Sequence, residues 1–156
     1  MSNNVSALLK QLSNVSHDLN EASNQLSEQI KNIEAALAAQ KLGVRAWVEI
    51  RRTPEPQEAS DGRIYQFTRV DSLGYDKHQG KWGLVVHSWI DEFADANDSD
   101  VSFLRDAPRE LRMSAVDALP KLIQEISEQA SKLAKEAARK AEQAKHISAL
   151  LNRKQH

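Results

Sequence analysis

Residues 106–151 read DAPRELRMSAVDALPKLIQEISEQASKLAKEAARKAEQAKHISALL, and this stretch decides the fold. A helix should begin near its start, because Asp106 can accept hydrogen bonds from free backbone N–H groups and Pro108 already has helical φ. We predict a short helix over residues 106–119, with an apolar face at three- and four-residue steps. Pro120 either kinks or ends this helix, and we favour a break, because proline removes a backbone donor and crowds the preceding turn.

Residues 120–152 are predicted to form a long helix, since good helix formers surround one apolar stripe. The stripe consists of Leu122, Ile123, Ile126, Ala130, Leu133, Ala137, Ala141, Ala144, Ile147 and Leu151. At about 1.5 Å per residue this helix extends roughly 45–50 Å, which exceeds the width of a small globular domain. Part of its stripe should therefore meet another long helix.

Residues 1–42 supply that second long helix. Apolar residues occupy the a and d positions of an almost unbroken heptad, including Val5, Leu8, Leu12, Val15, Leu19, Leu26 and Ile33. Acidic flanks on this helix and basic flanks on residues 132–154 favour an antiparallel, coiled-coil-like pair, although each surface ion pair contributes only about 0–1 kcal/mol. The predicted seam comprises Leu12, Leu19, Leu26 and Ile33 from the first helix and Ile126, Leu133, Ala137 and Ala141 from the second.

Residues 43–90 change from a helical period to the two-residue alternation of β-strands. We predict an antiparallel meander of three strands, with residues 53–62 as a proline-containing connection and residues 77–80 as a hairpin loop in which Gly80 takes positive φ. Together with the helices this gives a single α+β domain over residues 1–156.

Residues 91–105 form an acidic loop in this interpretation. The spacing of acidic and amide side chains in residues 95–99 resembles the start of a calcium-binding EF-hand loop. Asp100 stands where that loop needs a glycine, and Asp106 stands where it needs a bidentate glutamate. A solvated acidic linker without a metal site is therefore the prediction.

Three arginines at helical spacing, Arg105, Arg109 and Arg112, would form one row beside a helix N-terminus, and Lys121 could extend it. Guanidinium groups match the oxygens of phosphates, so the row is a candidate site for anions or nucleic acid. The alternative, which we favour, is that the arginines pair with nearby carboxylates such as Glu110.

A second candidate surface carries Trp47, His87 and Trp89 on one face of the sheet, with Arg45 and Arg51 beside them. Aromatic rings with arginines can stack on bases or hold a peptide partner. Burial under a packed helix is the more common fate of such tryptophans, and we favour it.

Composition limits the function classes. The chain of 156 residues contains no cysteine, which excludes disulfides, thiolate nucleophiles and cysteine-based zinc sites. The first residues lack the apolar core of a signal peptide and no run reaches membrane-spanning length, so we expect a cytoplasmic protein without membrane partners. Phosphate-binding loops and recognised catalytic motifs are absent, and we expect neither an enzyme nor a cofactor.

The order of long helix, small β segment and long helix is similar in architecture to prefoldin-type chaperone subunits, in which paired helices carry a β assembly platform. No prefoldin sequence motif accompanies the likeness. Our first hypothesis is a non-enzymatic assembly or protein-interaction module that forms homo-oligomers, most simply a two-fold dimer. The alternative is a regulatory protein that binds nucleic acid or an anionic ligand through the arginine row.

Overall fold

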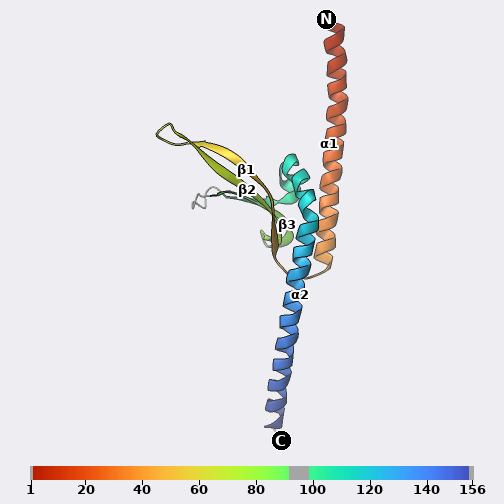
Figure 1. The fold of residues 1–156 in the computed structure, drawn as a ribbon. Helices are drawn as coiled ribbons and strands as arrows, with labels where there is room; N and C mark the ends of the chain where they lie inside the picture. Colours follow the sequence, from red (N-terminus) through yellow and green to blue (C-terminus); the bar gives the residue numbers. More distant parts are fainter. Residues whose placement is uncertain (1, 92–98, 155–156) are drawn as a thin grey trace.

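The computed structural model describes residues 2–91 and 99–154 and has an α+β fold (Figure 1). The described chain contains two long helices, four strands and one 3-10 turn. In order they are α1 (Ser2–Ala39), β1 (Ala46–Glu58), β2 (Ile64–His78), β3 (Lys81–Asp91), β4 (Asp100–Phe103), the turn η2 (Leu104–Asp106) and α2 (Arg109–Arg153).

The strands form one antiparallel sheet in the order β1-β2-β3-β4. The prediction of three strands was wrong, because β4 lies within the stretch that was interpreted as an acidic loop. Only four residues long, β4 pairs Phe103 with Val85 and Asp100 with Ser88. Such a short alternation, next to several acidic residues, gives too weak a signal to separate a strand from a loop.

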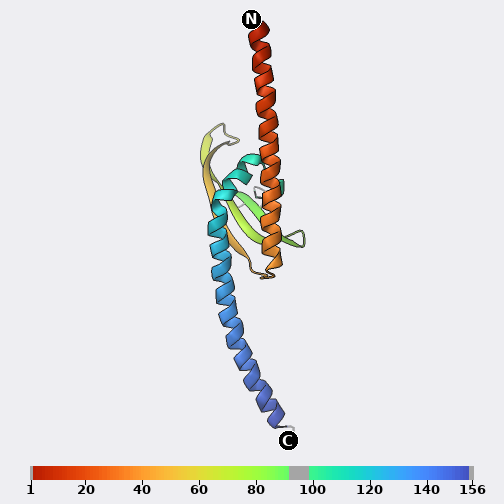
Figure 2. The same ribbon diagram turned by 90° about the vertical axis from the view of Figure 1, so that its right-hand side faces the viewer.

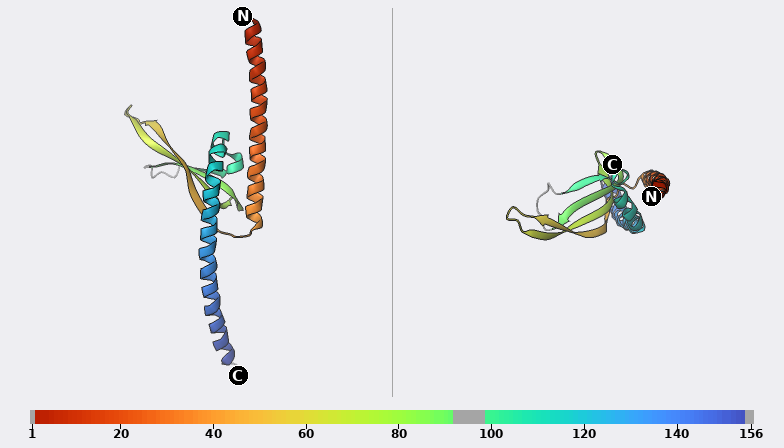
Figure 3. Two further views of the ribbon diagram at one scale, coloured as in Figure 1. Left: turned by 45° about the vertical axis from the view of Figure 1, so that its right-hand side comes forward. Right: turned by 90° about the horizontal axis from the view of Figure 1, so that it is seen from above.

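The first two strands are also longer than predicted. β1 continues through Pro54 and Pro56 and pairs with β2 as far as Glu58 and Ile64, so that residues 53–58 are strand and not connection. Since β1 is an edge strand, its prolines can present their nitrogens to the open side without interrupting the ladder. The resulting β1–β2 arm projects away from both helices (Figure 3).

The hairpin between β2 and β3 agrees with its prediction. His78 pairs with Lys81, and the two loop residues Gln79 and Gly80 have φ of 54° and 78°. Positive φ at both positions is the conformation that matches the twist of two antiparallel strands.

A β-bulge in β1 changes which face of the sheet carries Arg51. Glu49 pairs with Ser72 and Arg51 with Asp71, which leaves Ile50 as an extra residue between them. One extra residue reverses the alternation of all side chains that follow. Arg51 consequently lies on the helix-covered face, against Asp71, and not beside Trp47 as its spacing in the sequence predicted.

Residues 109–153 form one continuous helix with Pro120 inside it, so the predicted break between residues 119 and 120 was wrong. The first turns of α2 are inclined to the remainder (Figure 2), as expected where proline removes one hydrogen bond. Leu119 and Leu122 on either side of Pro120 are both buried in the same core. Their packing explains why the chain bends here and does not leave the helix.

The two helices run in the same direction and are staggered along their length (Figures 1 and 2). Arg112 in the first turn of α2 binds Ser23 and Ser27 of α1. Farther along both helices, Ile126 of α2 and Leu37 of α1 line the same groove. Residue numbers therefore rise together on the two helices. Within one chain they are parallel, and the predicted antiparallel coiled-coil pair, which could form within a chain or between chains, is not confirmed. The β segment returns the chain to the middle of α1 before α2 starts, and this return fixes the parallel direction.

The core lies between one face of the sheet and the overlapping parts of the helices. Ile30 is the α1 residue that is fully buried there, at 1% exposure, with Leu26, Ile33 and Leu37 packed partly around it. The first half of α2 contributes Leu111, Ala115, Leu119, Leu122 and Ile126, and the sheet contributes Ala46, Val48, Leu73, Tyr75, Leu84 and Val86.

Candidate functional site

The predicted helix seam divides into a buried part and an exposed part. Leu26, Ile33 and Ile126 contact the core of the same chain. Leu12, Leu19 and Leu133 are 63%, 47% and 54% exposed, and Ala137 and Ala141 are exposed as well. Only the inner part of the predicted seam is thus used within one chain.

We call residues 2–22 the α1 outer segment and residues 131–153 the α2 outer segment. They extend from opposite ends of the body (Figure 1). In the α1 outer segment the large apolar side chains are 47–63% exposed, namely Val5, Leu8, Leu9, Leu12, Val15 and Leu19. In the α2 outer segment they are 47–62% exposed, namely Leu133, Ile147, Leu150 and Leu151.

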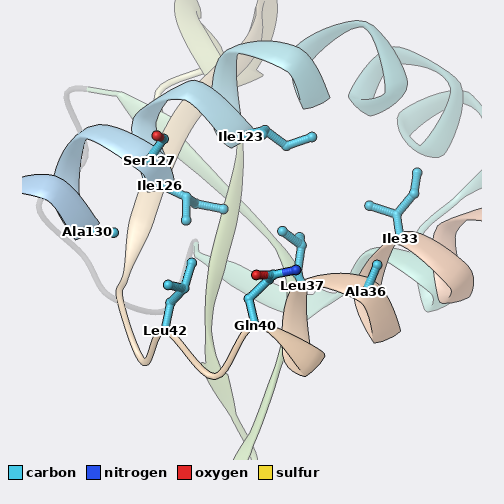
Figure 4. A pocket seen from close by; sticks show the side chains of 9 residues that line it. All are labelled: Ile33, Ala36, Leu37, Gln40, Leu42, Ile123, Ile126, Ser127 and Ala130. Atoms are coloured by element: carbon cyan, nitrogen blue, oxygen red, sulfur yellow. The ribbon is translucent and has the colours of Figure 1, made fainter.

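A groove of about 470 Å³ lies between the end of α1 and the middle of α2 (Figure 4). Its walls are mostly apolar and come from the end of α1, the following loop and the middle of α2: Ile33, Ala36, Leu37, Gln40, Leu42, Ile123, Ile126, Ser127 and Ala130. Ile123 lies at the edge of this groove and is 47% exposed. The groove therefore continues the apolar surface of the seam up to the start of the α2 outer segment.

The arginine row holds α1 against the body. Arg105 donates to Oε1 of Glu34 at 2.5 Å, and its guanidinium lies over the ring of Phe103. Arg112 donates to the side chains of Ser23 and Ser27. These partners are 71 to 89 residues away in the sequence, and not the nearby carboxylates that we favoured.

The other two members of the candidate row lie apart from these contacts. Arg109 is partly buried, and Lys121 is exposed on α2. Arg105 and Arg112 thus both bind α1, at different residues, and no described contact links Lys121 to either of them.

Glu34 is the α1 residue that ties the helix to the sheet. Its Oε1 accepts from Arg105, and its Oε2 accepts from the backbone N–H of Leu84 at 2.9 Å. The side chain is only 12% exposed. Its negative charge, together with burial as the larger cause, raises the pKa of the neighbouring Tyr75 above the ordinary value for tyrosine.

Trp47, His87 and Trp89 lie together on the face of the sheet opposite the core residues Ala46, Val48 and Val86. The ring of His87 lies 4.8 Å from that of Trp89 and 6.2 Å from that of Trp47. Trp47 covers Gly74, where an added Cβ would lie 2.3 Å from the indole ring. The indole N–H donates to Asp76, which also accepts from Arg45 at 2.7 Å. Arg45, Trp47, His87 and Trp89 therefore share one face. Trp47 remains 38% exposed there, so the burial that we favoured for the tryptophans is not found at Trp47.

A polar cluster that the sequence analysis missed lies on the opposite, helix-covered face. Asp71, 1% exposed, accepts from Arg51 at 2.8 Å and from the hydroxyl of Ser88. Arg51 also binds Glu110 in the first turn of α2, and these bonds, the one to Asp71 above all, raise the pKa of Arg51. The cluster forms a complete network of charges between the sheet and α2. No local pattern could reveal it, since it depends on the bulge at Ile50.

Among residues 2–91 and 99–154, no group of three histidine or carboxylate side chains could hold a metal ion. The calcium-loop spacing at residues 95–98 lies outside the described residues. Neither described helix has a stretch apolar enough to cross a membrane. No protein family model, no curated protein and no solved structure matches the chain.

Proposed function

We propose that this chain is a non-enzymatic assembly module that self-associates through the α1 and α2 outer segments, with a dimer as the simplest product. The observation that carries the proposal is the exposure of ten large aliphatic side chains on two helix stripes, of which the α2 stripe is filled by alanine between Leu133 and Ile147. Soluble monomers rarely expose contiguous apolar patches larger than a few hundred Å². Most helical stability in proteins also comes from the packing of an apolar face, and the outer segments lack this packing within one chain.

The magnitudes support association. Covering the exposed half of each of these side chains would contribute roughly 1 kcal/mol. In a dimer, covering both stripes of both chains would contribute about 20 kcal/mol, and covering only the α1 stripes about 12 kcal/mol. Association costs about 4–15 kcal/mol in lost freedom. The free energy gained by apolar burial exceeds this cost clearly when both outer segments take part, and by little when only the α1 outer segment does.

Sedimentation velocity over low to high micromolar concentrations tests the proposal, with the intact chain and two matched variants. Leu12→Glu places a charge within the α1 stripe, and Ile64→Glu places one on the β1–β2 arm, where Ile64 is 70% exposed. We expect the unaltered chain and Ile64→Glu to be dimers or larger, and Leu12→Glu to be monomeric, since burying an unpaired charge is costly. A monomeric unaltered chain, or an unchanged oligomer in Leu12→Glu, would contradict the proposal.

A second candidate function is binding of nucleic acid or another polyanion, now centred on the α2 outer segment. That segment carries six basic and two acidic side chains, all exposed. Arg105 and Arg112 are less suited to this role, because they bind α1. Fluorescence anisotropy with short DNA and RNA at low salt tests it, and we expect binding to fall with salt and to weaken in Lys140→Ala/Lys145→Ala. If neither DNA nor RNA binds at low salt, polyanion binding is excluded as a function.

A further inference from the structure

A second copy of this chain can cover the two outer segments in one particular arrangement. The inference rests on the proposed function and adds to it which helix meets which. We propose that the α1 outer segment of one chain pairs antiparallel with the α2 outer segment of its partner, and that the two chains exchange these segments reciprocally about a two-fold axis.

The geometry of a single chain leads to this arrangement. α1 and α2 run in the same direction, and their outer segments leave the body at opposite ends (Figures 1 and 3). A two-fold axis perpendicular to the helices reverses the second copy. The α2 outer segment of that copy then extends past the same end as the α1 outer segment of the first, with the opposite chain direction. The same operation forms the second pair at the other end, so both stripes of both chains are covered.

The lengths of the two segments match. The α1 outer segment, before its first described contact with α2 at Ser23, covers residues 2–22, or about 32 Å of helix. The α2 outer segment, after the last residue that lines the groove with α1, covers residues 131–153, or about 35 Å. An antiparallel pair of these segments leaves little of either stripe uncovered.

Charge favours this pair over the pairing of two α2 outer segments. The α1 outer segment has one lysine and two acidic residues, Asp18 and Glu21, both near its inner end. In an antiparallel pair that end meets the beginning of the partner's α2 outer segment, where Lys132 and Lys135 lie. Two α2 outer segments would instead place six basic residues against six, and like charges on facing helices repel.

Side-chain size agrees with this choice. The α1 stripe consists of leucine and valine, whereas the middle of the α2 stripe is alanine, at Ala137, Ala141 and Ala144. Large side chains can pack over small ones when two helices approach closely, and this contact replaces the area that α2 itself lacks. Pairing of α1 with α1 would cover the larger side chains and leave Leu133, Ile147 and Leu151 of α2 in water.

Cysteine cross-linking of the intact chain tests the arrangement, because the native sequence has no cysteine. We would compare Ser6→Cys/Ser148→Cys with Ser6→Cys/Ser131→Cys, using a short bismaleimide; all three serines are exposed. Ser131 and Ser148 lie about 25 Å apart on α2, and antiparallel exchange brings Ser148 next to Ser6 of the partner. Ser6→Cys alone controls for pairing of α1 with α1, and sedimentation of each variant shows whether the chains associate.

We expect dimers in sedimentation and several-fold more covalent dimer from the Ser148 variant than from the Ser131 variant. Dimers that cross-link preferentially through Ser131, through Ser6→Cys alone, or through none of these positions would overturn the exchanged pairing and leave the proposed self-association intact. Chains that sediment as monomers would instead overturn the proposed function itself.

Discussion

Replacing Ile30 by alanine should weaken the attachment of α1 to the body more than any change in the α1 outer segment. Ile30 is 1% exposed and lies in the core between the sheet and α2. The substitution removes three carbon atoms, which costs about 2.4 kcal/mol at 0.8 kcal/mol for each. The cavity left behind adds to this, so the free energy of unfolding should fall by about 3 kcal/mol, within the usual range of 2–5 kcal/mol.

The matched control is Leu12→Ala on the same helix. Leu12 is 63% exposed in the single chain, so its truncation should change the stability of the monomer by no more than about 0.5 kcal/mol. Urea unfolding followed by tryptophan fluorescence, at a concentration low enough to keep the chain monomeric, measures both values. The reasoning is refuted if Ile30→Ala costs less than about 1 kcal/mol, or if Leu12→Ala costs as much as Ile30→Ala.

Three further predictions concern the sheet. Asp71→Ala should lower the free energy of unfolding by about 2–3 kcal/mol, because Arg51 loses its buried acceptor; a loss below about 0.5 kcal/mol in urea unfolding would contradict this. Gly74→Ala should displace the ring of Trp47 and cost about 1–3 kcal/mol; the cost should be much smaller in a Trp47→Ala background, and an equal cost in both backgrounds would refute the clash. Because the pKa of Tyr75 is raised in the folded chain, the unfolded chain loses the tyrosine proton first as pH rises above about 10, and the free energy of unfolding should fall with pH there. In urea unfolding at alkaline pH, Tyr75→Phe should reduce this dependence of the free energy of unfolding on pH. An unchanged dependence would exclude Tyr75 as its source.

The two helical regions, parts of the long strands and the β2–β3 hairpin could be predicted from the sequence because each depends on local periodicity or turn chemistry. The continuity of α2 through Pro120 and of β1 through Pro54 and Pro56 could not. The heptad of α1 and the alanine stripe of α2 identify both helices. Gly80 identifies the hairpin, since positive φ favours glycine. These parts of the prediction concern neighbours in the chain and needed no knowledge of tertiary contacts.

The direction and partners of the helices could not be obtained in this way. Complementary charge on α1 and α2 predicted an antiparallel pair, and charge cannot distinguish pairing within a chain from pairing between chains. The direction within the chain follows from where β4 and η2 deliver the start of α2. The contacts that fix α1, from Arg105 to Glu34 and from Arg112 to Ser23 and Ser27, join residues far apart in sequence.

The candidate sites were likewise predicted correctly only where they depend on local alternation. Trp47, His87 and Trp89 were placed on one face from strand alternation, and they do share that face. Arg51 was assigned to it as well, and the bulge at Ile50 moves it to the other face. A single extra residue in a strand has no reliable signature in one sequence, although it determines the side of the sheet on which every following residue lies.

Hydrogen exchange of the intact chain at two concentrations tests the central claim most directly, because it reports which segments are covered when chains associate. If the outer segments pair between chains, the backbone amides of residues 5–22 and 133–151 should be protected at high micromolar concentration and lose protection on dilution, while the core around Ile30 and Leu122 keeps its protection. Rapid exchange of both outer segments at every concentration would contradict the account. Protection of the outer segments that persists at dilutions where sedimentation shows a monomer would contradict it as well.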